Sequence, residues 1–84
     1  MRRLQFMHPL FYERFNQILA EKKLTPKGLS RTMGISVNTA YDWINDMRIM
    51  TVVNFFELCK KLDVNPMWLY GISNDRTSFK ESLG

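Results

Sequence analysis

The feature that most constrains the fold is the stretch covering residues 25–45, where two short helical patterns meet at a tight turn. Thr25 is a good N-cap, and Pro26 stands at the first helical position, where the missing N–H of proline costs nothing. Gly34 suits the left-handed position after a helix, which a residue with a Cβ occupies only at a cost. Ser36 can cap the next helix. The stretch therefore predicts a helix-turn-helix, with a turn of roughly three or four residues.

The second of these two helices has a polar and an apolar side at about 100° per residue. The polar side carries Asn38, Tyr41, Asp42 and Asn45. The opposite half carries Val37, Ala40, Trp43 and Ile44. We expect the apolar half to pack inward. The polar side chains can then bond base edges or phosphates, because an α-helix fits the major groove of B-DNA. An ordinary solvated surface is the alternative, and it is the commoner case for an isolated amphipathic helix.

Length and composition fit one domain with a modest core. The chain has 84 residues, of which 45% are hydrophobic, enough to fold without disulfides. A single cysteine, Cys59, and a single histidine, His8, provide no disulfide framework and no metal cluster, and no cofactor is expected. Cys59 falls in an apolar helical pattern typical of a core residue, which fits a reducing, cytoplasmic setting. No stretch reaches the roughly 18 apolar residues of a membrane span.

Catalysis is not expected either. A nucleophile needs an activating base, and the only histidine precedes the first predicted helix while the only cysteine lies in an apolar stripe. The sequence also has no Gly-rich phosphate loop after a strand. We therefore predict that the chain is not an enzyme.

The charge distribution favours an anionic partner. The net charge is +4 and the pI is about 9.5. The basic residues near the turn and at the N-terminus are Arg2, Arg3, Lys22, Lys23, Lys27, Arg31 and Arg48. The helix with the polar face itself carries Asp42 and no basic residue. Attraction to phosphate must therefore come from the segments that flank this helix.

The chain divides into three parts. Residues 1–8 are interpreted as an arm. Either this arm is disordered, or the chain effectively starts at Met7, or the arm touches DNA through its arginines. Residues 9–72 form the domain, and their helical spacing predicts an all-α fold of five helices with no strands. Residues 73–84 are polar and without net charge, which predicts a flexible or loosely docked tail.

Two further patterns concern the core. The fourth predicted helix, about residues 52–62, has a broad apolar face made of Val52, Phe55, Phe56, Leu58, Cys59 and Leu62. The loop before it, residues 46–50, contains Met47, Ile49 and Met50. Such a loop is unusual in water, so we expect some of these side chains to pack over the core or to meet another subunit.

Several positions together resemble the lambda-repressor-like (Cro and repressor-type, XRE) DNA-binding domains over about residues 10–71. In the helix-turn-helix they are Leu24, Thr25, Leu29, Ser30, Gly34, Ile35, Ser36, Thr39 and Trp43. Further along they are Asn54, Phe55, Leu58, Lys60, Leu62, Val64, Trp68 and Leu69. Each match is weak alone, but their order and spacing are specific. The resemblance implies a compact five-helix domain whose third helix enters the major groove.

The resemblance also implies which residues contact DNA. The expected base-reading residues are Val37, Asn38, Thr39, Tyr41 and Asp42. The expected phosphate contacts are Lys27, Arg31, Ser36, Asn45 and Arg48. The family often has glutamine where this chain has Pro26, and Arg or Gln near Val37. These departures concern base preference and affinity rather than the fold.

The function implied is sequence-specific binding of duplex DNA to regulate transcription, as a phage-type repressor acting as a homodimer on a roughly palindromic operator. The fifth helix and the loop of residues 46–50 are both candidate dimer contacts. The alternative function is a protein-interaction module of the same fold that acts on another regulator or on polymerase. The acidic Asp42, the missing glutamine and the apolar loop motivate that alternative. The chain can also be the DNA-binding part of a longer repressor.

Overall fold

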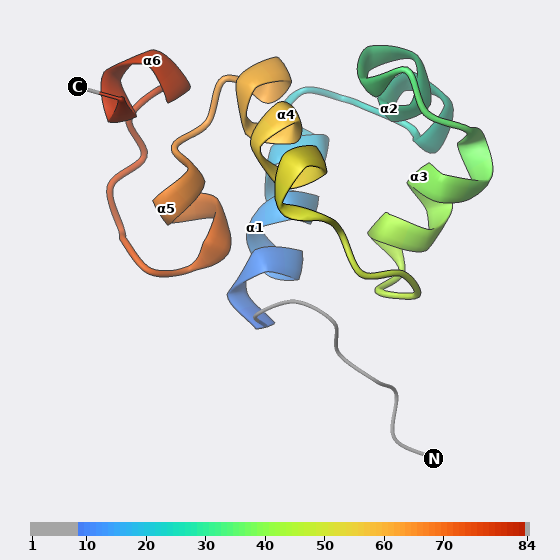
Figure 1. Ribbon diagram of the computed structural model, residues 1–84, viewed down its shortest axis with the longest axis horizontal. Helices are drawn as coiled ribbons and strands as arrows, with labels where there is room; N and C mark the ends of the chain where they lie inside the picture. Colours follow the sequence, from blue (N-terminus) through green and yellow to red (C-terminus); the bar gives the residue numbers. More distant parts are fainter. Residues whose placement is uncertain (1–8, 84) are drawn as a thin grey trace.

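The structure is a computed structural model that describes residues 9–83, so the expectations for residues 1–8, His8 included, lie outside the described residues. The described chain is helical and contains no strand, which confirms the predicted all-α class. Its helices are α1 (Pro9–Glu21), α2 (Pro26–Met33), α3 (Val37–Ile44), α4 (Val52–Leu62), α5 (Pro66–Tyr70) and α6 (Phe79–Ser82). In Figure 1, α1 and α4 occupy the centre, α2 and α3 lie at one end, and α5 and α6 lie at the other. None of the described helices is long and apolar enough to cross a bilayer.

Side-chain caps fix where the helices α2 to α5 begin, and Ser78 caps α6 in a capping box. The Thr25 hydroxyl accepts the N–H of Gly28 before α2, and Ser36 accepts the N–H of Thr39 before α3. Thr51 caps α4 and Asn65 caps α5 in the same way. These bonds satisfy backbone donors that have no partner inside the helix. The caps Thr25 and Ser36 confirm the two that the sequence analysis names.

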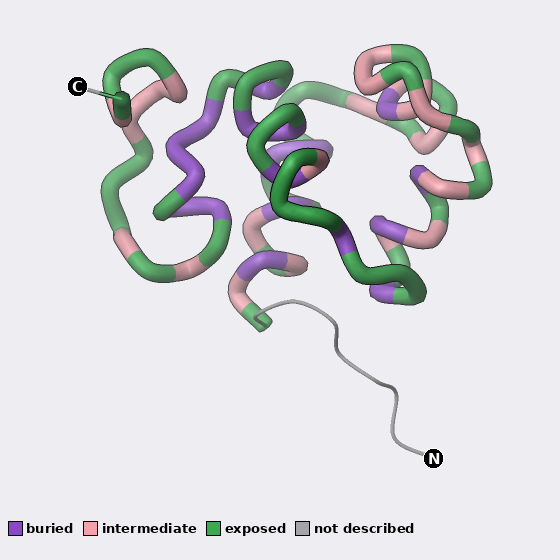
Figure 2. Tube along the Cα trace, in the orientation of Figure 1, coloured by how far each residue is buried: buried purple, intermediate pink, exposed green. Residues whose placement is uncertain are grey.

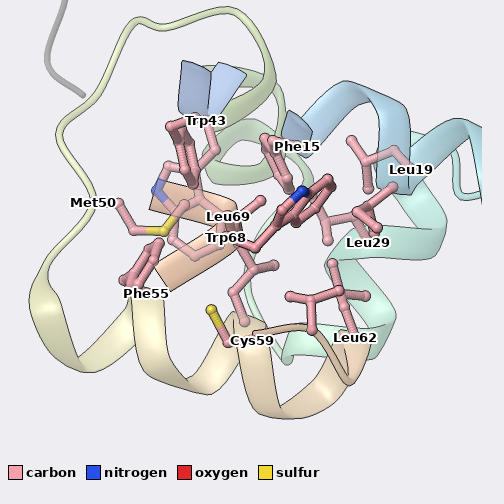
Figure 3. Packing of buried hydrophobic residues seen from close by; sticks show 14 of the residues in the cluster. Phe15, Leu19, Leu29, Trp43, Met50, Phe55, Cys59, Leu62, Trp68 and Leu69 are labelled. Carbon is pink, nitrogen blue, oxygen red and sulfur yellow. The ribbon is translucent and has the colours of Figure 1, made fainter. Parts of the chain in front are cut away.

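One buried cluster holds the helices together (Figure 3). It contains Phe11, Phe15, Ile18, Leu19, Leu29, Ala40, Trp43, Met50, Phe55, Leu58, Cys59, Leu62, Val64, Trp68 and Leu69. Trp43, near the C-terminal end of α3, is 1% exposed and anchors α3 to this core. Burial raises the pKa of the Cys59 thiol to about 12, so that thiol behaves as a small apolar residue in the core, as predicted.

Part of the predicted apolar face of α4 lies outside the core. Phe55, Leu58, Cys59 and Leu62 are buried, but Val52 and Phe56 are exposed. The expectation that these two residues pack inward is therefore wrong. The α4 sequence is apolar on two sides of the helix, so apolar spacing alone cannot identify the side that meets the core. In the preceding loop Met50 is buried, whereas Met47 and Ile49 are exposed (Figure 2).

Residues 73–83, for which the sequence predicts a flexible or loosely docked tail, lie against α1, α4 and α5 in the structure. The Arg14 guanidinium donates to the backbone oxygen of Ser73 at 2.8 Å. Arg76 forms an ion pair with Glu21 at 2.9 Å, which lowers the pKa of that carboxyl. The Phe79 N–H, at the start of α6, donates to Asp63 Oδ1 at the end of α4. These partners are 16 to 59 residues away in sequence, so the composition of the segment does not reveal them.

The Arg76 and Arg14 guanidinium carbons lie over the Trp68 ring, at 4.4 Å and 5.0 Å from its centroid. Such cation–π contacts contribute about 0.5–2 kcal/mol each, depending on desolvation. The Arg76 contact attaches the C-terminal segment to the side of the domain away from α2 and α3 (Figure 1).

Replacing Trp43 with alanine tests the anchoring of α3. Because the indole is almost fully buried, Trp43→Ala is expected to lower the free energy of unfolding by about 3–5 kcal/mol. Urea denaturation followed by circular dichroism measures this loss. Tyr41→Ala, on the exposed side of the same helix, serves as the control and is expected to change stability by about 0.5 kcal/mol or less. A loss below about 1 kcal/mol for Trp43→Ala would contradict the anchoring role.

Candidate nucleic-acid interface

The turn between α2 and α3 is set by its backbone. Gly34 has φ 70° and ψ 34°, the left-handed conformation that glycine adopts without strain. The Ser30 carbonyl accepts the N–H groups of Gly34 at 2.9 Å and of Ile35 at 3.1 Å. The Ser30 hydroxyl in turn donates to the backbone oxygen of Ile35. The chain direction thus changes within three residues, and α3 begins directly after the turn.

A second close approach occurs at the start of α2. A Cβ at Gly28 would lie 3.3 Å from Leu24 Cδ2 and 3.4 Å from Thr25 Oγ1, the oxygen that caps the helix. Glycine at this position therefore leaves room for the cap and for Leu24, which packs against the core. This contact accounts for a residue that otherwise disfavours a helix.

The outer side of α3 is polar and exposed. Asn38, Tyr41 and Asn45 are exposed, and Tyr41 retains 51% of its surface. Thr39 and Asp42 are partly exposed. Val37, which the helical periodicity places on the apolar half, is only partly buried, because it lies at the boundary between the two sides.

Some of these side chains already have partners. Ser36 Oγ accepts the N–H of Thr39 at 3.1 Å and donates to the Thr39 hydroxyl at 2.9 Å. Asn45 Nδ2 donates to the Tyr41 carbonyl at 3.0 Å, one turn earlier in α3. Ser36 and Asn45 therefore shape the two ends of α3, while within residues 9–83 the side chains of Asn38 and Tyr41 form no hydrogen bond.

Asp42 and Arg48 are brought together by the fold. Arg48 Nη2 lies 2.9 Å from Asp42 Oδ2, and Arg48 Nε lies 3.2 Å from the same oxygen. Asp42 is on α3, and Arg48 is in the loop that follows. The sequence gives no indication of this pair, because the residues are six apart and the loop does not continue the helix. The pair neutralises the only acidic side chain of α3.

Two basic side chains are exposed on α2, the helix that packs against α3. Lys27 and Arg31 are exposed and stand four residues apart, so they lie on one side of the helix. The first turn of α2 contains no acidic residue. Of the ten residues predicted to contact DNA, the structure thus places two basic ones on α2, seven around α3 and Arg48 after it. Sequence reasoning missed no charged residue of α2 or α3.

The described residues contain no group of three or more His, Cys, Asp and Glu side chains that could hold a metal ion. The exposed polar face of α3, with cations on α2 and in the loop, has the groups that donate to phosphates and pair with base edges.

Comparison with known proteins agrees with this geometry. A family model described as a Cro/C1-type HTH DNA-binding domain matches residues 14–74, well over half of the chain. No curated protein and no solved structure gives a significant match. The family match includes both helices of the helix-turn-helix and continues through α4 and α5. This chain belongs to the Cro/C1-type helix-turn-helix DNA-binding domain family.

Proposed function

We propose that this DNA-binding protein is a sequence-specific transcriptional regulator, a repressor of the phage repressor or Cro type, that acts in the cytoplasm as a homodimer. The observation that supports this proposal most is the α3 face, where Asn38 and Tyr41 project from a helix held by the buried Trp43. Lys27 and Arg31 are exposed on α2, which packs against α3. The function requires no cofactor and no catalysis.

The contacts divide by chemistry. Lys27, Arg31 and Arg48 are assigned to phosphates, where cations position the domain without reading sequence. Asn38 is assigned to a base, because an amide pairs bidentately with adenine. Tyr41, Thr39 and Val37 complete the base-reading surface through a hydroxyl or apolar contact. Ser36 and Asn45 cap the ends of α3, and their backbone or remaining polar atoms are assigned to phosphate.

Asp42 and Arg48 act together in this proposal. A free carboxylate in the groove would be repelled by phosphate, but the Arg48 guanidinium offsets its charge at 2.9 Å. Asp42 can still accept a hydrogen bond from cytosine N4 through Oδ1, which does not bond Arg48. The pair therefore allows an acidic residue to remain on the face that approaches DNA.

Selection of bound duplexes from a random pool tests the proposal. Enrichment of a palindromic site, with half-sites about 34 Å apart, is the expected result for a dimer. If the selected operator overlaps a promoter, binding blocks polymerase and represses transcription. Failure to enrich any sequence would contradict sequence-specific binding.

The second candidate function is the protein-interaction module. The exposed Met47 and Ile49 favour it, since a domain that only binds DNA has no need of these side chains in water. The Asp42–Arg48 pair weakens the other motive for it, the uncompensated acidic residue. A salt titration separates the two functions, because DNA binding through phosphates weakens steeply with salt, whereas weak binding that is flat with salt favours the module.

Replacing Asn38 with alanine tests base reading. Asn38→Ala is expected to lower affinity for the selected operator about tenfold or more, because a bidentate base contact contributes roughly 1–3 kcal/mol of discrimination. Fluorescence anisotropy on the operator and on a random duplex measures the effect. Affinity for the random duplex and the melting temperature should stay nearly constant. Asn16→Ala, on the exposed side of α1, is the matched control.

Replacing Lys27 with alanine tests the phosphate role. Lys27→Ala is expected to weaken operator and random duplexes by the same factor, and to reduce the log–log salt slope by about 0.9. Lys80→Ala, on α6 at the opposite end of the domain, removes the same charge as a control and should leave the slope unchanged. A loss confined to the operator would show that Lys27 reads a base.

Replacing Asp42 with asparagine tests the ion pair. Asp42→Asn keeps the shape of the side chain but releases Arg48, so affinity for random duplexes is expected to rise several-fold and the salt slope to steepen. Stability should change by less than about 1 kcal/mol, because both side chains are substantially exposed. The same change in an Arg48→Ala background should have a smaller effect. If Asp42→Asn had equal effects in both backgrounds, the ion pair with Asp42 would not limit the contact of Arg48 with phosphate.

A further inference from the structure

An exposed apolar surface surrounds the start of α4. It consists of Ile49, Val52, Val53 and Phe56, whose exposed fractions range from 46% to 72%, and we call it the α4 patch. Val52, Val53 and Phe56 lie on neighbouring positions of one helix side, and Ile49 precedes them in the loop. Figure 2 shows this first turn of α4 exposed on the near face of the molecule. Adjoining apolar side chains of this number, together on a small domain, mark an interaction site.

The patch is held in a defined shape. The Phe56 ring packs edge-on against the buried Phe55 ring, with centroids 5.6 Å apart. The loop that leads into α4 is anchored by Asp46, which is 2% exposed, and by the buried Met50. The exposed side chains therefore stand on a fixed support, so a partner would lose little entropy in ordering them.

The C-terminal segment does not cover the patch in the described part of the chain. Residues 73–83 bond Arg14 and Glu21 on α1, Asn65 before α5, and Asp63 at the far end of α4. This docking uses the surroundings of α5, the other candidate dimer helix. The apolar side chains at the start of α4 stay exposed beside this docked segment.

We propose that the α4 patch binds a second copy of this chain, with the two α4 helices antiparallel across a two-fold axis near Val53. This inference rests on the proposed function, which needs a dimer, and names its surface. In this register Val52 of one subunit faces Val53 of the partner subunit, and the reverse contact is identical, as an isologous interface requires.

Charge supports a second copy as the occupant. Glu57 follows the patch on the same side of α4 and has no ion-pair or hydrogen-bond partner within residues 9–83. In the antiparallel register its carboxylate lies beside the N-terminal end of the partner subunit's α4. The first turn of α4 contains no acidic residue, and a helix N-terminus attracts a carboxylate. The α4 patch, with its apolar centre and charged rim, is therefore complementary to a second copy of itself.

The position of the patch also suits a DNA-binding dimer. A stable interface covers about 800 Å² on each partner, with an apolar centre and a polar rim. The patch supplies the centre, and Glu57 and Lys60 supply part of the rim. Since the anchored loop joins α4 directly to α3, a two-fold axis at α4 fixes the distance between the two α3 helices.

Sedimentation velocity of the full chain without DNA, over a range of concentrations, tests the inference. The unmodified chain is expected to dimerise, and Val53→Lys to raise the dimer dissociation constant at least tenfold. Leu83→Lys introduces the same side chain at an equally exposed apolar position, 69% against 72%, and should leave the dimer intact. Circular dichroism checks that both variants fold. A monomeric unmodified chain, equal losses in both variants, or a loss caused instead by Met67→Lys on α5 would overturn the proposal.

A cysteine at the axis gives a second measurement. Val53→Cys is expected to form a disulfide between copies on mild oxidation, because the two copies of this residue face each other at the axis and a disulfide joins Cα atoms about 4–7 Å apart. The buried Cys59, with its raised pKa, does not compete. Leu83→Cys is the control, and equal cross-linking there would contradict the register.

These outcomes are separable from those of the proposed function. Cross-linking at Val53 without any DNA binding would support this interface and overturn the regulator. Operator binding by a chain that stays monomeric and does not cross-link would support the regulator and overturn this interface.

Discussion

The carbonyl oxygen of Ser30 accepts two backbone N–H groups, and the orientation of the exposed face of α3 depends on that turn. Both bonds require the left-handed Gly34 between α2 and α3. With the turn fixed, the buried Trp43 can face the core only if Asn38 and Tyr41 face away from it. Local backbone geometry and core packing thus determine the same orientation of α3, so the exposed polar face requires no separate stabilisation.

Much of the fold follows from local chemistry in the sequence. The caps Thr25, Ser36, Thr51 and Asn65 each act within three residues, and Gly34 needs only its own backbone conformation, so these features are visible in a single stretch of sequence. What could not be predicted involves distant partners. The docking of residues 73–83 depends on Arg14 and Glu21, more than fifty residues earlier.

The candidate site shows the same division. The face of α3 is predictable because a helix repeats every 3.6 residues. The Asp42–Arg48 ion pair is not, since it depends on how the loop after α3 turns back. The sequence also does not reveal which side of α4 is exposed, because Val52 and Phe56 are as apolar as the buried residues beside them. Hydrophobicity identifies a side chain that prefers burial, but only the arrangement of the other helices decides which one is buried.

The two tryptophans lie in environments of different polarity. Trp43 is surrounded by the apolar core beneath the exposed face of α3, whereas the Trp68 ring contacts two guanidinium groups, one of them from the C-terminal segment. Indole emission is sensitive to nearby charge, so the two residues act as separate intrinsic probes at opposite ends of the domain. Detachment of the C-terminal segment would change the emission of one indole while the other reports an intact core.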